Sequence, residues 1–215
     1  MALVPPPMED EAAGRARHLR GGAVKGIVFL DRDGTLIEET GYLSDPSLLR
    51  EIPHAAEALR RLSREGYALA VVSNQAGVAK GKFREDQMEA VHRTFIGYFR
   101  DRGVEFAAVE YCLHHPEGVV ERYRTVCGCR KPAAGMAEKI LQRLEISAGH
   151  RIWMVGDKMS DILMGKRLRA ETILVATGYG EQERLAGERR GERPDRYLPS
   201  IREAAEWIVS GGKAE

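Results

Sequence analysis

The sequence has no surplus of charge of either sign. Its 33 Lys and Arg residues face 32 Asp and Glu residues, which leaves a formal net charge of +1. A chain this close to neutrality has no extended field with which to hold a nucleic-acid backbone or an anionic membrane. We therefore expect neither a nucleic acid nor a membrane among its partners.

Long apolar runs are also absent. The longest stretch without a charged residue, residues 66–79, has 14 residues, whereas a membrane-spanning helix needs about 18. Residues 1–23 run through three prolines and then through acidic and basic clusters, without the apolar core of a signal peptide. These absences predict a soluble, cytoplasmic protein whose residues 1–23 form a flexible tail.

Cysteine is scarce, and its three copies all lie between residues 112 and 129. Three thiols cannot all pair in disulfides, so the cluster favours a metal site. Three thiolates and one imidazole make a closed tetrahedral set for structural Zn²⁺, whereas a catalytic zinc would keep one position open. The residues alone leave open whether His114 or His115 is the fourth ligand of this zinc loop.

Short apolar runs rich in β-branched residues alternate with amphipathic segments. This alternation is typical of a parallel sheet with helices on both faces. The predicted strands are residues 24–30, 68–73, 107–112, 152–156 and 172–176. Apolar residues at helical spacing predict helices around residues 55–62, 88–99, 136–144 and 201–209.

The segment of residues 181–194 is crowded with Arg, Glu and Gly and is interpreted as a solvated loop. A length of 215 residues corresponds to about 1.4 average domains. We therefore predict an α/β fold with one doubly wound, mainly parallel sheet, forming a single domain over residues 24–210 with a small zinc loop at 112–129.

Polar residues follow the predicted strands at their carboxyl ends, where open parallel sheets bind their ligands. They are Asp31 and Asp33, Ser73 and Asn74, and Asp157, and Lys131 precedes the third helix. Carboxylates that approach one another repel unless a cation joins them, and oxygen ligands suit Mg²⁺. Lys131, Lys158 and the Ser73 hydroxyl provide the groups that an incoming phosphate needs.

The order of these segments resembles the haloacid dehalogenase superfamily of phosphohydrolases. Its four motifs are matched by residues 31–36, by Ser73, by Lys131, and by residues 156–157 with Asp161. The resemblance implies a Rossmann-like fold and an aspartyl-phosphate intermediate, which divides one difficult displacement into two easier ones.

The same resemblance implies a role for each motif residue. Asp31 would attack phosphorus, and Asp33 would protonate the leaving group and then deprotonate the hydrolytic water. Mg²⁺ would be held by Asp31, the backbone carbonyl of Asp33, and Asp157. Ser73, Asn74 and Lys131 would stabilise the transferred phosphoryl group, while Asp161 would brace Lys131 or a metal-bound water.

The cysteine cluster resembles the zinc loop of the D-glycero-D-manno-heptose 1,7-bisphosphate phosphatases. In that family the ligands match Cys112, His114, Cys127 and Cys129, so the resemblance implies His114. It extends through residues 39–42, 73–81 and 135–136 and implies these substrate contacts: Glu39, Thr40, Gly41, Tyr42, Gln75, Arg130 and Lys158. The sequence departs from the family at Leu113, at residues 133–134 and at His54, where proline, a lysine–proline pair and often glycine are usual.

Only 18 residues separate Thr35 from His54, so no cap domain fits between them. An open site must recognise its substrate through contacts at the rim. Because Lys131 is committed to the transferred phosphate, Arg130 is free to hold a second, distant phosphate. For Gly34 the sequence does not separate a simple turn from room made for the phosphate.

We therefore expect a monomeric phosphatase that hydrolyses heptose 1,7-bisphosphate at the 7-position. Histidinol-phosphate phosphatases share the zinc loop, although residues 74–81 follow the heptose pattern better. DNA 3′-phosphatases carry a similar aspartate motif, but the neutral charge balance counts against them. An alternative of another class is an inactive, zinc-stabilised interaction module.

Overall fold

Six parallel strands form one sheet in the order β3-β2-β1-β4-β5-β6. The computed structural model describes residues 24–146 and 149–213. The strands are β1 (Gly26–Leu30), β2 (Tyr67–Asn74), β3 (Ala108–Cys112), β4 (Arg151–Gly156), β5 (Glu171–Val175) and β6 (Arg196–Leu198). Strand order reverses between β1 and β4, where such sheets open a crevice.

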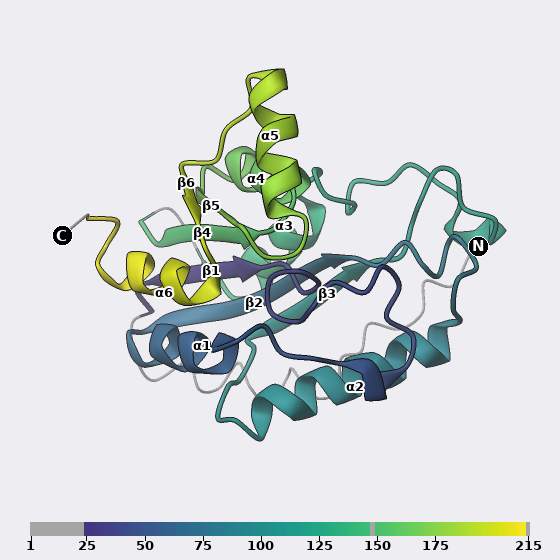
Figure 1. The fold of residues 1–215 in the computed structure, drawn as a ribbon, viewed down its shortest axis with the longest axis horizontal. Coiled ribbons are helices and arrows are strands. Elements are labelled where there is room, and N and C mark those ends of the chain that lie inside the picture. The colour runs from purple at the N-terminus through teal and green to yellow at the C-terminus, as the bar shows by residue number, and fades with distance from the viewer. Residues whose placement is uncertain (1–23, 147–148, 214–215) are drawn as a thin grey trace.

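Helices cover both faces of this sheet (Figure 1). They are α1 (Ala55–Arg64), α2 (Glu85–Arg100), α3 (Gly135–Arg143), α4 (Met159–Arg167), α5 (Gly180–Arg190) and α6 (Ile201–Val209), with short 3-10 helices η2 (Pro46–Leu48) and η3 (Glu121–Tyr123). Val28 and Leu30 pack with α1, α2 and α6, whereas Ile27 and Phe29 pack with α3 and α4. Strand β1 is therefore buried on both faces, as a central parallel strand must be.

The predicted doubly wound parallel sheet is confirmed, with three differences along the chain. The short edge strand β6 and helix α4 were not predicted. The interpretation of residues 181–194 as a loop was wrong, because α5 occupies most of that segment. Its apolar residues follow no helical stripe, but Arg184 pairs with Glu181 and Glu188 at i,i+3 and i,i+4 spacing, which supports a helix without an apolar face.

No cap domain folds between the first strand and α1. Within residues 31–54 the structure has two isolated bridges, which pair Ile37 with Asp33 and Glu51, together with η2. His54 precedes α1 with φ of 67°, a left-handed conformation that glycine adopts more easily. None of the helices within the described residues is both long and apolar enough to cross a membrane. The predicted tail, residues 1–23, lies outside the described residues.

Candidate active site

A cleft of about 410 Å³ lies at the carboxyl ends of the central strands. Its lining includes every residue predicted to act in catalysis, phosphate binding or substrate contact, with the exception of Thr40. Thr40 is exposed outside the lining, and the predicted metal ligand Asp157 is fully buried beside the cleft. The strand-end positions predicted from the sequence thus converge on one cavity.

Asp31 lies at the centre of the cleft floor, next to two buried charged residues. The Nζ of Lys131 lies 2.6 Å from Asp31 Oδ1 and 2.7 Å from Asp161 Oδ1. Burial opposes the charge on Lys131, but Asp161 and Asp31 raise the pKa of Lys131. Burial likewise opposes ionisation of Asp31, but Lys131 and Lys158 hold the pKa of Asp31 below its usual value. Asp31 is therefore an ionised carboxylate, the form that a nucleophile requires.

Only one of the two carboxyl oxygens of Asp157 has a hydrogen-bond partner among the described residues. Its Oδ2 accepts a hydrogen bond of 2.9 Å from the Tyr179 amide, while its buried Oδ1 has no hydrogen-bond partner among the described residues. Burial, followed by the nearby charge of Asp31, raises the pKa of Asp157 to about 8. One oxygen each from Asp31, Asp157 and Asp161 lie within 4.8 Å of one another. An oxygen-rich group with an unpartnered buried carboxyl oxygen fits a hard divalent cation such as Mg²⁺.

The Asp33 carboxylate points to a different set of donors. Arg32, itself only 1% exposed, donates from Nε and Nη2 to both Asp33 oxygens over 2.9–3.1 Å. Gln75 Nε2 donates to Asp33 Oδ2 over 2.7 Å and lies 2.9 Å from Ser73 Oγ. Sequence reasoning gave Arg32 no role, although a cation between two carboxylates at a buried strand end was a visible signal.

Asn74 fixes the loop that carries Lys131. Its side-chain amide donates to the Lys131 carbonyl and accepts from the Lys131 amide, both over 3.0 Å. The Lys131 ammonium then donates to the Val72 carbonyl over 2.7 Å. Two neighbouring segments of the rim are in this way joined behind the nucleophile.

Gly34 closes the turn behind the first motif. Its φ is +81°, and a Cβ atom there would lie 2.2 Å from Asp157 Oδ2. The glycine therefore serves a left-handed turn and makes room for the Asp157 carboxylate. Thr177 Oγ1 donates to the Gly34 carbonyl over 2.6 Å. Sequence reasoning missed the contribution of Thr177 and Tyr179, although their position just after β5 places them at the same edge of the sheet.

One side of the cleft mouth is built around Lys158. Its Nζ lies 2.9 Å from Glu39 Oε2 and 4.6 Å from the centre of the Tyr179 ring. Glu39 Oε1 accepts from the Gly41 amide over 2.7 Å. Burial opposes the charge on Lys158, but Asp157 and Asp31 raise the pKa of Lys158. Lys158 therefore keeps its positive charge beside Asp31.

Arg130 and Lys80 also line the cleft. Arg130 Nη1 donates to the His114 carbonyl over 3.3 Å, and within residues 24–146 and 149–213 neither cation has an acidic partner at ion-pair distance. After burial, the charges of Lys80 and Arg130 both lower the pKa of His115. Two cations that have no ion-pair partner in the described part of the chain thus lie near one ring, an arrangement suited to an anionic ligand. Lys80 was not among the predicted contacts.

The four predicted zinc ligands meet beyond β3. Cys129 Sγ lies 3.1 Å from Cys127 Sγ, 3.2 Å from Cys112 Sγ and 3.3 Å from His114 Nδ1. A hydrogen bond from Cys112, with those from Cys127 and His114, lowers the pKa of Cys129 to about 5 against the effect of burial. His115 Nδ1 instead accepts from the Glu117 amide over 3.1 Å. Tetrahedral Zn²⁺ places its thiolate ligands roughly 3.8 Å apart, so this compact group fits zinc.

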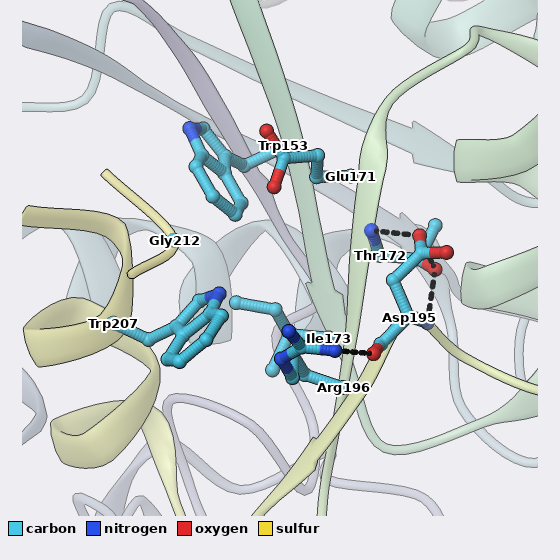
Figure 2. A pocket seen from close by; sticks show the side chains of 8 residues that line it. All are labelled: Trp153, Glu171, Thr172, Ile173, Asp195, Arg196, Trp207 and Gly212. Atoms are coloured by element: carbon cyan, nitrogen blue, oxygen red, sulfur yellow. Dashed lines mark hydrogen bonds between the residues drawn. The ribbon is translucent and has the colours of Figure 1, made fainter. Parts of the chain in front are cut away.

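A second cavity of about 250 Å³ lies at the amino ends of β4 and β5, beside α6 (Figure 2). Trp153 and Trp207 form its walls. Thr172 donates from its amide and its hydroxyl to Asp195 over 2.8 and 2.6 Å, and Glu171 pairs with Arg151 at 2.7 Å. Since these polar groups are already paired, the cavity lacks the converging charges of the strand-end cleft.

Comparison with known proteins agrees with this geometry. A family model described as HAD-hydrolase-like matches residues 128–204. D-glycero-beta-D-manno-heptose-1,7-bisphosphate 7-phosphatase of Escherichia coli (strain K12) is 36% identical over 184 residues, covering 85% of this chain and 87% of that protein. The enzyme of the same name from Pasteurella multocida (strain Pm70) is 41% identical over 156 residues, covering 72% and 84%.

A solved structure has the same fold. It is the D,D-heptose 1,7-bisphosphate phosphatase from B. bronchiseptica complexed with magnesium and phosphate. It superposes with a TM-score of 0.75 at 24% identity, covering 86% of this chain and 99% of that one. At this identity the likeness shows the fold alone, while the sequence relatives show the family.

Proposed function

The chain belongs to the D-glycero-beta-D-manno-heptose-1,7-bisphosphate 7-phosphatase family of HAD-like hydrolases, and we propose that it removes the 7-phosphate of this sugar bisphosphate. The chain is a phosphoric monoester hydrolase. The observation that carries the proposal is the buried group of Asp31, Lys131 and Asp161 next to the unpartnered Asp157 oxygen. This group joins an ionised nucleophile to the positive charge that a phosphoryl group requires.

Asp31 attacks phosphorus in line with the leaving sugar oxygen and forms an aspartyl phosphate. Lys131, Ser73 and Lys158 neutralise charge on the equatorial oxygens. Asp33 protonates the leaving oxygen and then takes a proton from the water that hydrolyses the aspartyl phosphate. Asn74 holds the backbone of Lys131 and so keeps its ammonium on the phosphoryl group.

Two metals belong to this proposal. Asp31, Asp157 and the Asp33 backbone carbonyl would hold Mg²⁺, which supplies charge neutralisation and orientation of the phosphoryl oxygens. Cys112, His114, Cys127 and Cys129 would hold a structural Zn²⁺. Arg130 and Lys131 follow Cys129 directly, so a fixed loop aims both cations at the substrate. We place the reaction in the cytoplasm, where these thiols stay reduced, and assign it to a monomer.

The second phosphate of the substrate explains Arg130. Because no cap domain encloses the cleft, specificity depends on contacts at its rim. The guanidinium of Arg130 lines the cleft and has no carboxylate partner among the described residues. A planar fork binds a phosphate through two parallel hydrogen bonds. Glu39, Gly41, Tyr42 and Gln75 line the same cleft and are assigned contacts with the sugar, as is Thr40 at its edge.

Steady-state kinetics of Arg130→Ala tests this proposal. The variant should raise KM for the bisphosphate by about 10- to 100-fold, the cost of about 1.5–3 kcal/mol for a lost charged hydrogen bond. KM for a simple sugar monophosphate should change less than threefold. Arg124→Ala is the matched control, since Arg124 is an exposed arginine of the same loop outside the cleft lining. Equal effects of Arg130→Ala on both substrates would contradict the assignment, and absence of phosphate release from any substrate would favour an inactive module.

A further inference from the structure

A chain of polar side chains extends from the Asp33 carboxylate away from the cleft. Its first member is Arg32, whose Nε and Nη2 hold both Asp33 oxygens, and whose Nη2 also donates to Gln75 Oε1 over 3.0 Å. The remaining group, Arg32 Nη1, is buried and makes no hydrogen bond among the described residues. The plane of this guanidinium therefore needs another support.

That support comes from an aromatic ring on β3. The guanidinium carbon of Arg32 lies 5.6 Å from the centre of the Tyr111 ring, within the range of a cation–π contact. The Tyr111 hydroxyl lies 3.0 Å from His92 Nδ1, and the two rings meet edge to face at 5.4 Å. His92 is on α2 and Tyr111 is on the edge strand β3, so these contacts join a helix and an edge strand to the strand-end motif.

We propose that Arg32, Tyr111 and His92 form a positioning relay that holds the Asp33 carboxyl at the leaving oxygen of the substrate. The inference rests on the acid–base role proposed for Asp33. None of the three residues would touch the reacting atoms. Each would act through its neighbour: His92 on the Tyr111 hydroxyl, Tyr111 on the guanidinium, and Arg32 on the carboxylate.

The direction of the relay follows from the state of His92. Burial, followed by the charge of Arg32, lowers the pKa of His92 to about 4. The imidazole is therefore neutral in the working range, and its Nδ1 can accept a hydrogen bond from the Tyr111 hydroxyl. The hydrogen bond between the Tyr111 hydroxyl and His92 fixes the Tyr111 ring. That ring, together with the paired hydrogen bonds to Asp33, fixes the guanidinium of Arg32. An acid held by several contacts keeps the geometry that proton transfer requires.

The test compares two leaving groups. A sugar phosphate needs protonation of its leaving alkoxide, whereas 4-nitrophenyl phosphate releases a stable anion and needs little. Tyr111→Leu removes the ring and should lower the ratio of kcat/KM for the sugar phosphate to kcat/KM for the aryl phosphate by about tenfold. Arg32→Lys keeps the charge but loses the fork, and should lower the same ratio. Tyr111→Phe keeps the ring but loses the hydroxyl contact with His92, and should lower the ratio by less than Tyr111→Leu does.

Tyr98→Leu is the matched control. Tyr98 is also partly buried, and Arg102 lies 3.5 Å from its ring centre, but Arg102 pairs with Glu51 and not with Asp33. Its variant should leave the ratio within twofold of wild type. If Asp33→Asn changes the ratio while Tyr111→Leu and Arg32→Lys do not, the relay is wrong, but the acid–base role proposed for Asp33 is supported. If Asp33→Asn itself leaves the ratio unchanged, the role proposed for Asp33 is wrong and the relay with it.

Discussion

Asp31 and Asp33 are two residues apart but differ in the partners that hold them. Asp31 is enclosed by Lys131 and Lys158 and stays ionised, whereas Asp33 faces Arg32 and Gln75 at the edge of the cleft. Such a division of environments lets one carboxyl attack while the other transfers protons. The roles should therefore separate in single variants.

Asp31→Asn should reduce turnover of every phosphate ester by at least about 10⁴-fold, because it removes the attacking group. Asp33→Asn should reduce kcat/KM for a sugar phosphate by about 10²–10⁴-fold and kcat/KM for 4-nitrophenyl phosphate far less. Steady-state kcat/KM on the two esters measures this effect, because it does not include the later hydrolysis of the aspartyl phosphate, in which Asp33 also acts. Equal losses on both esters in both variants would contradict the division of roles.

The zinc loop is the element whose stability depends most on one small group. Cys127→Ser removes one of four ligands that lie within 4.8 Å of one another. Structural zinc binds zinc-finger peptides with about 10–16 kcal/mol, so even partial loss should lower Tm by roughly 5–10 °C. Elemental analysis should find about one zinc per purified chain and less in the variant. Zinc-free wild-type protein, or a variant with unchanged Tm, would refute a structural zinc.

How far the elements could be predicted depended on periodicity. Strands β1, β2, β4 and β5 consist mainly of apolar residues, β3 is mostly apolar apart from Glu110, and α2 and α6 carry regular stripes, so the sequence predicted them within a few residues. Helix α5 has no stripe of apolar residues, and ion pairs such as Arg184–Glu188 support it instead, so its apolar periodicity gave no signal. Strand β6 has only three residues, which is too short for an alternating apolar pattern.

The site divides in the same way. Residues that follow strands, such as Asp31 and Asp157, could be placed because strand ends meet at one edge of a parallel sheet. The partners of Arg32 could not be inferred, since His92 and Tyr111 are distant in sequence and their contact depends on how α2 packs on β3. Thr40 was assigned by resemblance, and the structure leaves it outside the cleft lining.

At the scale of the whole molecule, the buried carboxyls link folding to pH and to metal. Burial is the largest cause that raises the pKa of Asp157 to about 8 and that of Asp161 to about 6. Since both usual values are 3.8, the folded state keeps protons that the unfolded state releases. The two protonated carboxyls therefore contribute fully to the free energy of unfolding below the usual pKa of 3.8. This contribution is lost as the pH rises through their folded-state pKa values of about 6 and about 8.

Without Mg²⁺, Asp157→Asn should therefore gain Tm relative to wild type as pH rises from about 5.5 to about 8.5. Mg²⁺ binds the ionised carboxylates, so it should raise the Tm of wild type more at the higher pH and that of the variant little at either. Thermal melts with and without Mg²⁺ measure both effects. A Tm difference between variant and wild type that stays constant with pH would contradict the linkage.

We propose that this open cleft selects a sugar bisphosphate and cleaves one of its two esters. The most direct test is a competition in which heptose 1,7-bisphosphate and histidinol phosphate are supplied together with Mg²⁺, while ³¹P NMR follows each ester. We expect the 7-phosphate signal to disappear first, leaving heptose 1-phosphate, with kcat/KM at least about tenfold above that for histidinol phosphate. Faster loss of histidinol phosphate, or release of the 1-phosphate, would contradict it.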